Sequence, residues 1–150
     1  MDLLNDPKLH WSRFTGSSRF DYPIDYSAAM LNVHDNGRLD LAYRWAPDSY
    51  CHFHRHLAPT SSVVLEGELH VIDYDDDGAE QERRVRTVGD YSHSSTPDVH
   101  MELGGPEGAV VLFTIETPDD DRLSEVLARD LTVIRTSTGE DVRKAWAKRR

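Results

Sequence analysis

The stretch CHFHRHLAPTSSVVLEGELHV, residues 51–71, carries three histidines at alternate positions. Successive side chains of a β-strand point to opposite faces, so His52, His54 and His56 would all project to one side. Imidazole is the commonest metal ligand in proteins, so three imidazoles on one face indicate either a metal site or a polar strand face in water. The stretch therefore predicts a strand over residues 52–56 whose histidines are candidate metal ligands.

Short β-like runs continue on both sides of this stretch. Turn sequences such as HDNGR, APDS, LEGE, DDDGAE, TVGD and GGPEG separate them, and DNG is a clear hairpin signal. Many short strands with no helix between them are typical of an antiparallel barrel or sandwich. The predicted strands cover residues 29–34, 38–45, 52–56, 61–65, 68–73, 81–87, 91–94, 100–103 and 109–117.

The two ends of the chain depart from this pattern. Residues 1–28 are mixed and turn-rich, which predicts an irregular arm. After Pro118, PDDDRLSEVLARDL has acids first and then Leu123, Val126, Leu127 and Leu131 at helical spacing. STGEDVRKAWAKRR has acids first and bases last, as the helix dipole favours. We expect a single domain over 1–150, with an arm (1–28), an all-β barrel (29–117) and an extension of one or two helices (118–150).

Composition excludes several classes of partner. The 150 residues have a formal net charge of −10, which argues against binding nucleic acid. Cys51 is the single cysteine, so no internal disulfide points to secretion. No apolar run reaches membrane-spanning length, and no basic-then-apolar leader opens the chain. We expect a cytoplasmic protein with no membrane partner, and a homodimer, because open strand edges tend to pair.

A second segment, GDYSHSSTPDVHMEL (residues 89–103), begins at Gly89 and places His100 eleven positions later. Together the two segments resemble the motifs of the cupin superfamily, small β-barrels of jelly-roll type. The first cupin motif has a His-x-His pair, and the second begins with Gly and ends near a His. The resemblance spans residues 43–117 and implies that His54, His56 and His100 are the metal ligands.

The match departs from the family pattern at several positions. The glutamate of the first motif should fall at Thr60, which is not acidic, and Asp48 stands where that motif opens with Gly. In the second motif the usual Pro falls at Ser95 and the usual Gly at Pro97, so that loop must be built differently. His52 has no counterpart in the motif and is a candidate additional ligand.

Three neutral imidazoles leave a divalent metal its full charge, so the site should prefer anionic, bidentate oxygen ligands such as an enolate. The missing glutamate, together with HRH, LEGEL and GDY, resembles the acetylacetone-cleaving dioxygenase type. That resemblance implies Fe(II), molecular oxygen and cleavage of a carbon–carbon bond in a small β-diketone or hydroxyketone. Zn(II) or another divalent metal would suit the same three histidines, giving a hydrolase, lyase or isomerase of similar substrates. A non-catalytic protein that binds or senses a small ligand is the third hypothesis.

Strand parity nominates the residues around the metal. Glu102 shares a face with His100 and is a candidate base or ligand. Small side chains on the parity of Thr60 would leave room for a substrate. The residues predicted to contact the metal ligands or to line the substrate pocket are Glu102, His70, His93, Thr60, Ser62, Val64 and Tyr43.

Overall fold

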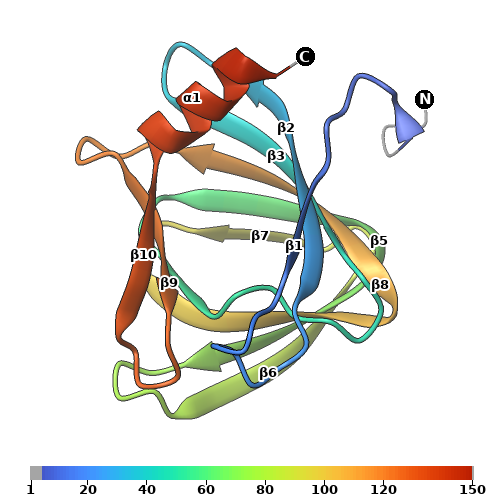
Figure 1. Ribbon diagram of the computed structural model, residues 1–150. Coiled ribbons are helices and arrows are strands. Elements are labelled where there is room, and N and C mark those ends of the chain that lie inside the picture. Colours follow the sequence, from blue (N-terminus) through green and yellow to red (C-terminus); the bar gives the residue numbers. More distant parts are fainter. Residues whose placement is uncertain (1–4, 150) are drawn as a thin grey trace.

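The computed structural model describes residues 5–149, which form a ten-stranded sheet and one helix (Figure 1). The strand ladders are all antiparallel. The elements are β1 (Ser12–Thr15), β2 (Asp25–Val33), β3 (Arg38–Trp45), β4 (His54–His56), β5 (Thr60–Tyr74), β6 (Glu80–Thr87), β7 (Tyr91–Ser94), β8 (Asp98–Glu116), β9 (Arg122–Leu127), β10 (Val133–Thr138) and α1 (Gly139–Lys148).

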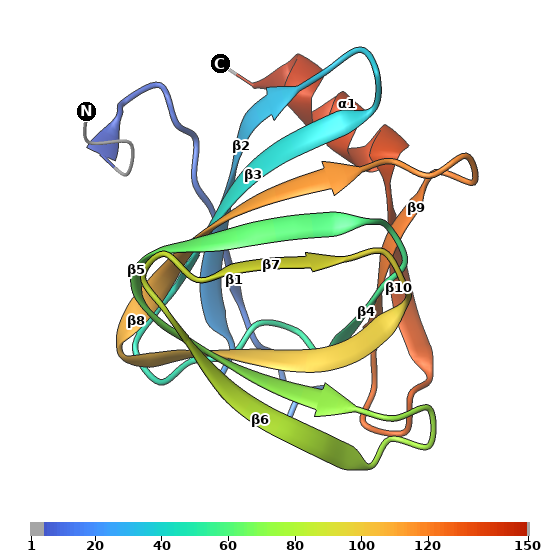
Figure 2. The same cartoon turned by 180° about the vertical axis from the view of Figure 1, so that it is seen from behind.

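The sheet curls on itself into a half-barrel, as the two opposite views show (Figures 1 and 2). One path runs β1-β2-β3-β8-β4-β9-β10, and β5 branches from it by pairing with β8, β6 and β7. The sheet thus has two parts, the main path and the branch of β5, β6 and β7. The long strands β5 and β8 pair with each other and join these two parts, so that the sheet bends around a common interior. The predicted all-β architecture is confirmed at this level, as a curled sheet with one C-terminal helix.

Two pairs of predicted strands are each one continuous strand. Residues 61–65 and 68–73 both belong to β5, and residues 100–103 and 109–117 both belong to β8. The turn sequences between them are accommodated as register shifts, at Val64/Glu66 and Gly67/Leu69. Gly67 has φ of +68°, and a Cβ there would lie 2.1 Å from the carbonyl oxygen of Gly108. Glycine is required at this crossing because the two backbones touch.

The predicted helix after Pro118 is wrong. Residues 122–127 form β9, which pairs with β4 and β10. Leu123 and Leu127 are 5% and 0% exposed. A spacing of four places two side chains on one face of a helix and of a strand alike, so the pattern could not separate the two. Tertiary pairing decided for the strand.

The second predicted helix is present as α1. Thr138 caps it: its hydroxyl accepts from the backbone of Asp141, whose carboxylate in turn accepts from the backbone N–H of Thr138. The extension over 118–150 is thus two strands followed by one helix. At the other end β1 pairs with β2, which already begins at Asp25, so the arm is shorter than residues 1–28. No helix within residues 5–149 has the length and apolar character needed to cross a bilayer.

The interior is filled from both parts of the sheet. The largest cluster contains Trp45, Leu69 and Val111, which are 2%, 0% and 0% exposed. A second cluster contains Phe53 and Leu127 and lies under the ends of β4 and β9. Between these apolar groups the interior carries buried polar side chains, which are Thr60, Ser62, Arg86, His100 and Glu102.

Candidate metal centre

Two neighbouring strands bring the histidines together. β4 pairs with β8 so that His54 lies opposite His100. His56 is two residues from His54, and Glu102 is two residues from His100, so alternation places all four side chains on the inner face. Their ligand atoms lie within 4.8 Å of one another. The sequence-predicted triad is therefore assembled, and a carboxylate lies with it.

The spacing of the four ligand atoms suits a single ion. The Nε2 atoms of His54 and His56 are 3.0 Å apart. Oε1 of Glu102 lies 3.4 Å from Nε2 of His54 and 3.3 Å from Nε2 of His100. Two nitrogens each bound at about 2.1 Å to one ion at a right angle would lie about 3.0 Å apart. The cluster thus has the dimensions of neighbouring ligands on one metal.

Hydrogen bonds orient two of the three imidazoles. Nδ1 of His54 lies 2.7 Å from the carbonyl oxygen of His52, and Nδ1 of His100 lies 3.1 Å from Oδ2 of Asp98. Carbonyl and carboxylate oxygens only accept, so both Nδ1 atoms must donate and each Nε2 is turned toward the cluster. Nε2 of His100 is buried and makes no hydrogen bond of good geometry within residues 5–149, although Oε1 of Glu102 lies 3.3 Å away. A divalent ion would satisfy that nitrogen, so the residues fit a metal.

Burial and charge set the protonation of the cluster. Burial lowers the pKa of His54 to about 4 and that of His56 to about 3, which keeps both imidazoles neutral at pH 7. Burial alone would also lower the pKa of His100, but the carboxylates of Glu102 and Asp98 outweigh it and raise that pKa to about 10. Burial opposes the ionised form of Glu102, yet His100 holds the pKa of that carboxyl at about 2. Without a metal, His100 and Glu102 form a buried ion pair.

Two cavities adjoin the cluster. One, of about 160 Å³, is mostly apolar and is lined by side chains that include Tyr26, Leu41 and Tyr43. The other, of about 310 Å³, is polar and holds Arg84 and Arg86. Three residues line both cavities: His56, Glu102 and Phe113. A bound metal would therefore be reachable from both cavities.

His52 does not join the cluster. The strand begins at His54 rather than at residue 52, so His52 lies outside its alternation. Its Nδ1 is 2.8 Å from the hydroxyl of Tyr26, and its ring packs edge-on against Phe20 and Tyr26. His52 instead lines the apolar cavity, and the prediction of an additional ligand is not supported by this placement.

His70, nominated for the substrate pocket, lines neither cavity beside the cluster. The register shifts around Gly67 reverse the alternation of β5, so that Val71 rather than His70 lines the polar cavity. His70 lies outside both cavities described above, with Nε2 3.1 Å from Oε2 of Glu68. Val64, on the parity predicted for the pocket, is 1% exposed and packs in the main core instead.

The remaining nominated residues lie around the two cavities. The buried Thr60 and Ser62 line the polar one. His93 lies exposed at its rim, with Nδ1 2.8 Å from Oγ of Ser61. Tyr43 lines the apolar cavity and also packs against Phe113 of the core.

Several functional candidates were not found from the sequence. Asp98, which orients His100, and Arg86, which lines the polar cavity, are ordinary charged residues in the sequence, and only strand pairing places them inside.

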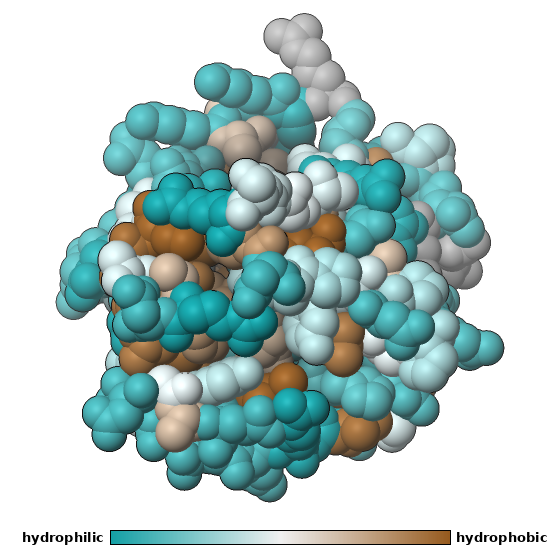
Figure 3. All heavy atoms as spheres, turned by 60° about the horizontal axis from the view of Figure 1, so that its bottom comes forward, coloured by the Kyte–Doolittle hydropathy of each residue, from teal (hydrophilic) through white to brown (hydrophobic). Residues whose placement is uncertain are grey.

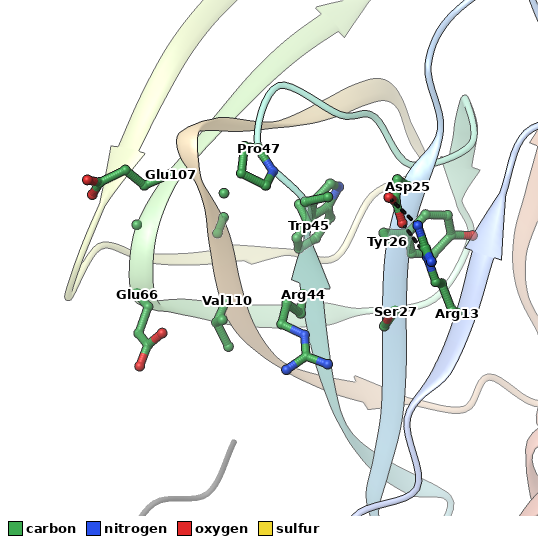
Figure 4. A pocket seen from close by; sticks show the side chains of 14 residues that line it. Arg13, Asp25, Tyr26, Ser27, Arg44, Trp45, Pro47, Glu66, Glu107 and Val110 are labelled. Carbon is green, nitrogen blue, oxygen red and sulfur yellow. Dashed lines mark hydrogen bonds and ion pairs between the residues drawn. The ribbon is translucent and has the colours of Figure 1, made fainter. Parts of the chain in front are cut away.

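Another hollow, of about 550 Å³, lies apart from the cluster and contains Arg13 paired with Asp25 (Figure 4). No histidine of the described chain lines it.

Solved structures share this fold. A cupin 2 conserved barrel domain protein from Rhodopseudomonas palustris is 11% identical, with a TM-score of 0.65 over 82% of this chain and 80% of that chain. An acetylacetone dioxygenase from Acinetobacter johnsonii is 16% identical, with a TM-score of 0.65 over 92% and 87%. A variant of oxalate decarboxylase from Bacillus subtilis is 17% identical, with a TM-score of 0.57 over 72% of this chain but only 27% of that one.

No family model matches the sequence, and no curated protein is significantly similar to it. At these identities the structural likeness establishes the fold alone. The chain has the cupin fold, which confirms the resemblance drawn from its two histidine motifs.

Proposed function

We propose that this cupin-fold chain is a metal-dependent enzyme that cleaves a carbon–carbon bond of a small β-diketone or hydroxyketone with molecular oxygen. The observation that carries the proposal is the convergence of His54, His56, His100 and Glu102 between two cavities. The likeness to the acetylacetone dioxygenase of Acinetobacter johnsonii supports it. Fold does not decide function, so the chemistry of the site has to support the proposal.

The three imidazoles and Glu102 are the residues that would hold the metal, which we propose to be Fe(II). Such an ion would supply Lewis acidity toward an enolate and redox chemistry toward oxygen. The carboxylate of Glu102 cancels part of the metal charge, so the demand for an anionic substrate is weaker than three histidines alone would impose. Asp98 holds the ring of His100 in place.

The apolar cavity suits the carbon skeleton of such a substrate. Leu41, Tyr43 and Phe113 line it and would exclude water from the reacting carbons. The hydroxyl of Tyr26 lies 2.8 Å from Nδ1 of His52, which places a polar pair in the wall of this mostly apolar cavity. Together these side chains would bind and orient a small dicarbonyl.

Elemental analysis followed by oxygen-electrode assays tests the proposal. We expect about one iron per chain after reconstitution and oxygen uptake that depends on added acetylacetone. His54→Ala and His100→Ala should each lose the metal, while His70→Ala, a histidine away from the cluster, should retain it. A reconstituted protein without stoichiometric metal, or with unchanged metal in His54→Ala and His100→Ala, would sink the proposal.

The same ligands would also serve an oxygen-independent hydrolase, lyase or isomerase with Zn(II) or another divalent ion. Turnover of acetylacetone under argon would favour that alternative. A role in ligand binding alone would require metal and ligand binding with no turnover in either atmosphere. The homodimer and the cytoplasmic location expected from the sequence stay predictions.

A further inference from the structure

Arg86 is a buried cation whose contacts are all with neutral atoms. It is 8% exposed. Nη1 donates to Oγ of Ser62, and Nη2 donates to the backbone carbonyls of Ser62 and Asp90. Within residues 5–149, no carboxylate oxygen comes within ion-pair distance of its guanidinium. A buried arginine is costly unless an anion accompanies it.

The neighbouring arginine in the same cavity is already paired. β6 pairs with β5 so that Arg84 lies opposite Val71 and Arg86 opposite Leu69, and both arginines share the inner face. Nη1 of Arg84 lies 2.6 Å from Oδ2 of Asp73. Arg84 therefore has an ion-pair partner within the protein, whereas the carboxylates of Glu102 and Asp90 act on Arg86 only from beyond ion-pair distance.

The other charges of the polar cavity balance once a metal is present. Asp98 and Glu102 carry two negative charges, which a divalent ion held by the cluster would offset. Arg84 and Asp73 cancel each other. The positive charge of Arg86 then has no balancing negative charge in the cavity, which is about 310 Å³ in volume and is also lined by His56, His100 and Glu102.

We propose that Arg86 binds a carboxylate of the substrate, so that the preferred substrate is a keto acid that reaches the metal from the polar cavity. This inference rests on the proposed function, because it assigns the substrate class of the same site. The guanidinium presents several N–H donors in a planar fork that suits a carboxylate. The serines and threonine of this cavity, Thr60, Ser62, Ser92 and Ser94, add neutral hydrogen-bonding groups around the anion.

The face that includes β6 is largely exposed and hydrophilic (Figure 3). Most of β6 is exposed, and hydrophilic side chains cover much of the view in which the bottom of the molecule comes forward (Figure 3). The apolar cavity shares His56 and Glu102 with the polar one. The site therefore offers a polar end for a charged group and an apolar end for a carbon chain.

The test compares acetoacetate with acetylacetone, which have the same number of heavy atoms and differ by one negative charge. Dissociation constants are measured by calorimetry under argon with the metal-loaded protein. Wild type should bind acetoacetate at least about tenfold more tightly, since a charge-assisted hydrogen bond is worth more than that factor. Arg86→Met should abolish this preference while changing acetylacetone affinity less than about twofold.

Arg13→Met is the control, because Arg13 lines neither cavity beside the cluster and is paired with Asp25; it should keep the preference. Arg86→Lys, which retains the charge without the fork, should keep part of it. Melting curves check that each variant folds. If Arg86→Met does not fold, the wild-type preference and the Arg86→Lys result decide the question.

Equal affinity of wild type for the two probes overturns the inference. So does a folded Arg86→Met variant that loses both probes equally, because a purely structural role would do that. The metal-free protein separates this inference from the proposed function. If the chain holds no metal, the proposed function fails, yet an Arg86-dependent preference for acetoacetate would still support the carboxylate site.

Discussion

Glu102 is the residue that most changes the chemistry of the site. The first cupin motif would supply its carboxylate from position 60, where this chain has a threonine whose hydroxyl donates to the carbonyl of Ala58. The carboxylate found beside the histidines is instead that of Glu102 on β8, two residues after His100, and this residue is 5% exposed. A buried carboxylate among imidazoles lowers the net charge of a bound divalent ion, so the centre is less electrophilic than a triple-histidine site.

Replacing Glu102 by Gln should lower metal affinity at least about tenfold, because the amide keeps the shape but removes the negative charge. Competition with a chromophoric chelator measures that affinity. Glu68→Gln is the control, since Glu68 contacts His70 away from the cluster. Equal affinity in Glu102→Gln and wild type would show that the carboxylate is not a ligand.

At the scale of elements, the crossing of β5 and β8 positions the site. The register shifts around Gly67 turn Val71 inward and His70 outward, and they let one strand serve both parts of the sheet. The crossing is tight because the backbone of Gly67 lies against that of Gly108. Both glycines have positive φ, which other residues adopt only with strain.

Gly67→Ala should destabilise the protein by more than the roughly 1–3 kcal/mol that a strained backbone alone costs, because the new methyl would also clash with Gly108. Urea unfolding measures the change in free energy. Gly89→Ala isolates the backbone part, since Gly89 has φ of +89° but nothing within 4 Å of an added Cβ. Equal destabilisation by the two substitutions would contradict the close approach.

At the scale of the whole molecule, the curled sheet encloses a set of ionisable groups that a metal-free protein must stabilise alone. His54 and His56 are held neutral, and His100 is held protonated beside Glu102. Each of these protonation states makes the free energy of folding depend on pH, because the same groups in the unfolded chain have pKa values near the ordinary ones.

The metal-free protein should therefore be most stable near pH 6.5. The pKa values of His54 and His56 are depressed, so their contribution is complete above about 6.5 and is lost as pH falls toward 4. The pKa of His100 is raised, so its contribution is complete below about 6.5 and is lost as pH rises toward 10. Melting temperatures of the chelator-treated protein between pH 4 and 10 measure the loss of stability on both sides of this optimum.

His100→Gln serves as the control, because it removes the imidazole whose raised pKa causes the loss of stability between pH 6.5 and pH 10. A melting temperature that stays constant from pH 6.5 to pH 10 in the metal-free wild type would contradict the buried ion pair between His100 and Glu102.

The sequence alone determined the features that depend on local periodicity. Alternation placed His54 and His56 on one face, the two motifs identified His100, and the turn and charge patterns located most strands and the final helix. Tertiary structure decided whatever depended on register or on pairing between distant strands. It made residues 122–127 a strand, turned His70 outward, left His52 with Tyr26, brought Glu102 to the histidine cluster and placed Arg86 in the adjoining polar cavity. The reason is physical: a one-residue shift in a strand reverses every face after it, and only contacts with neighbouring strands set that shift.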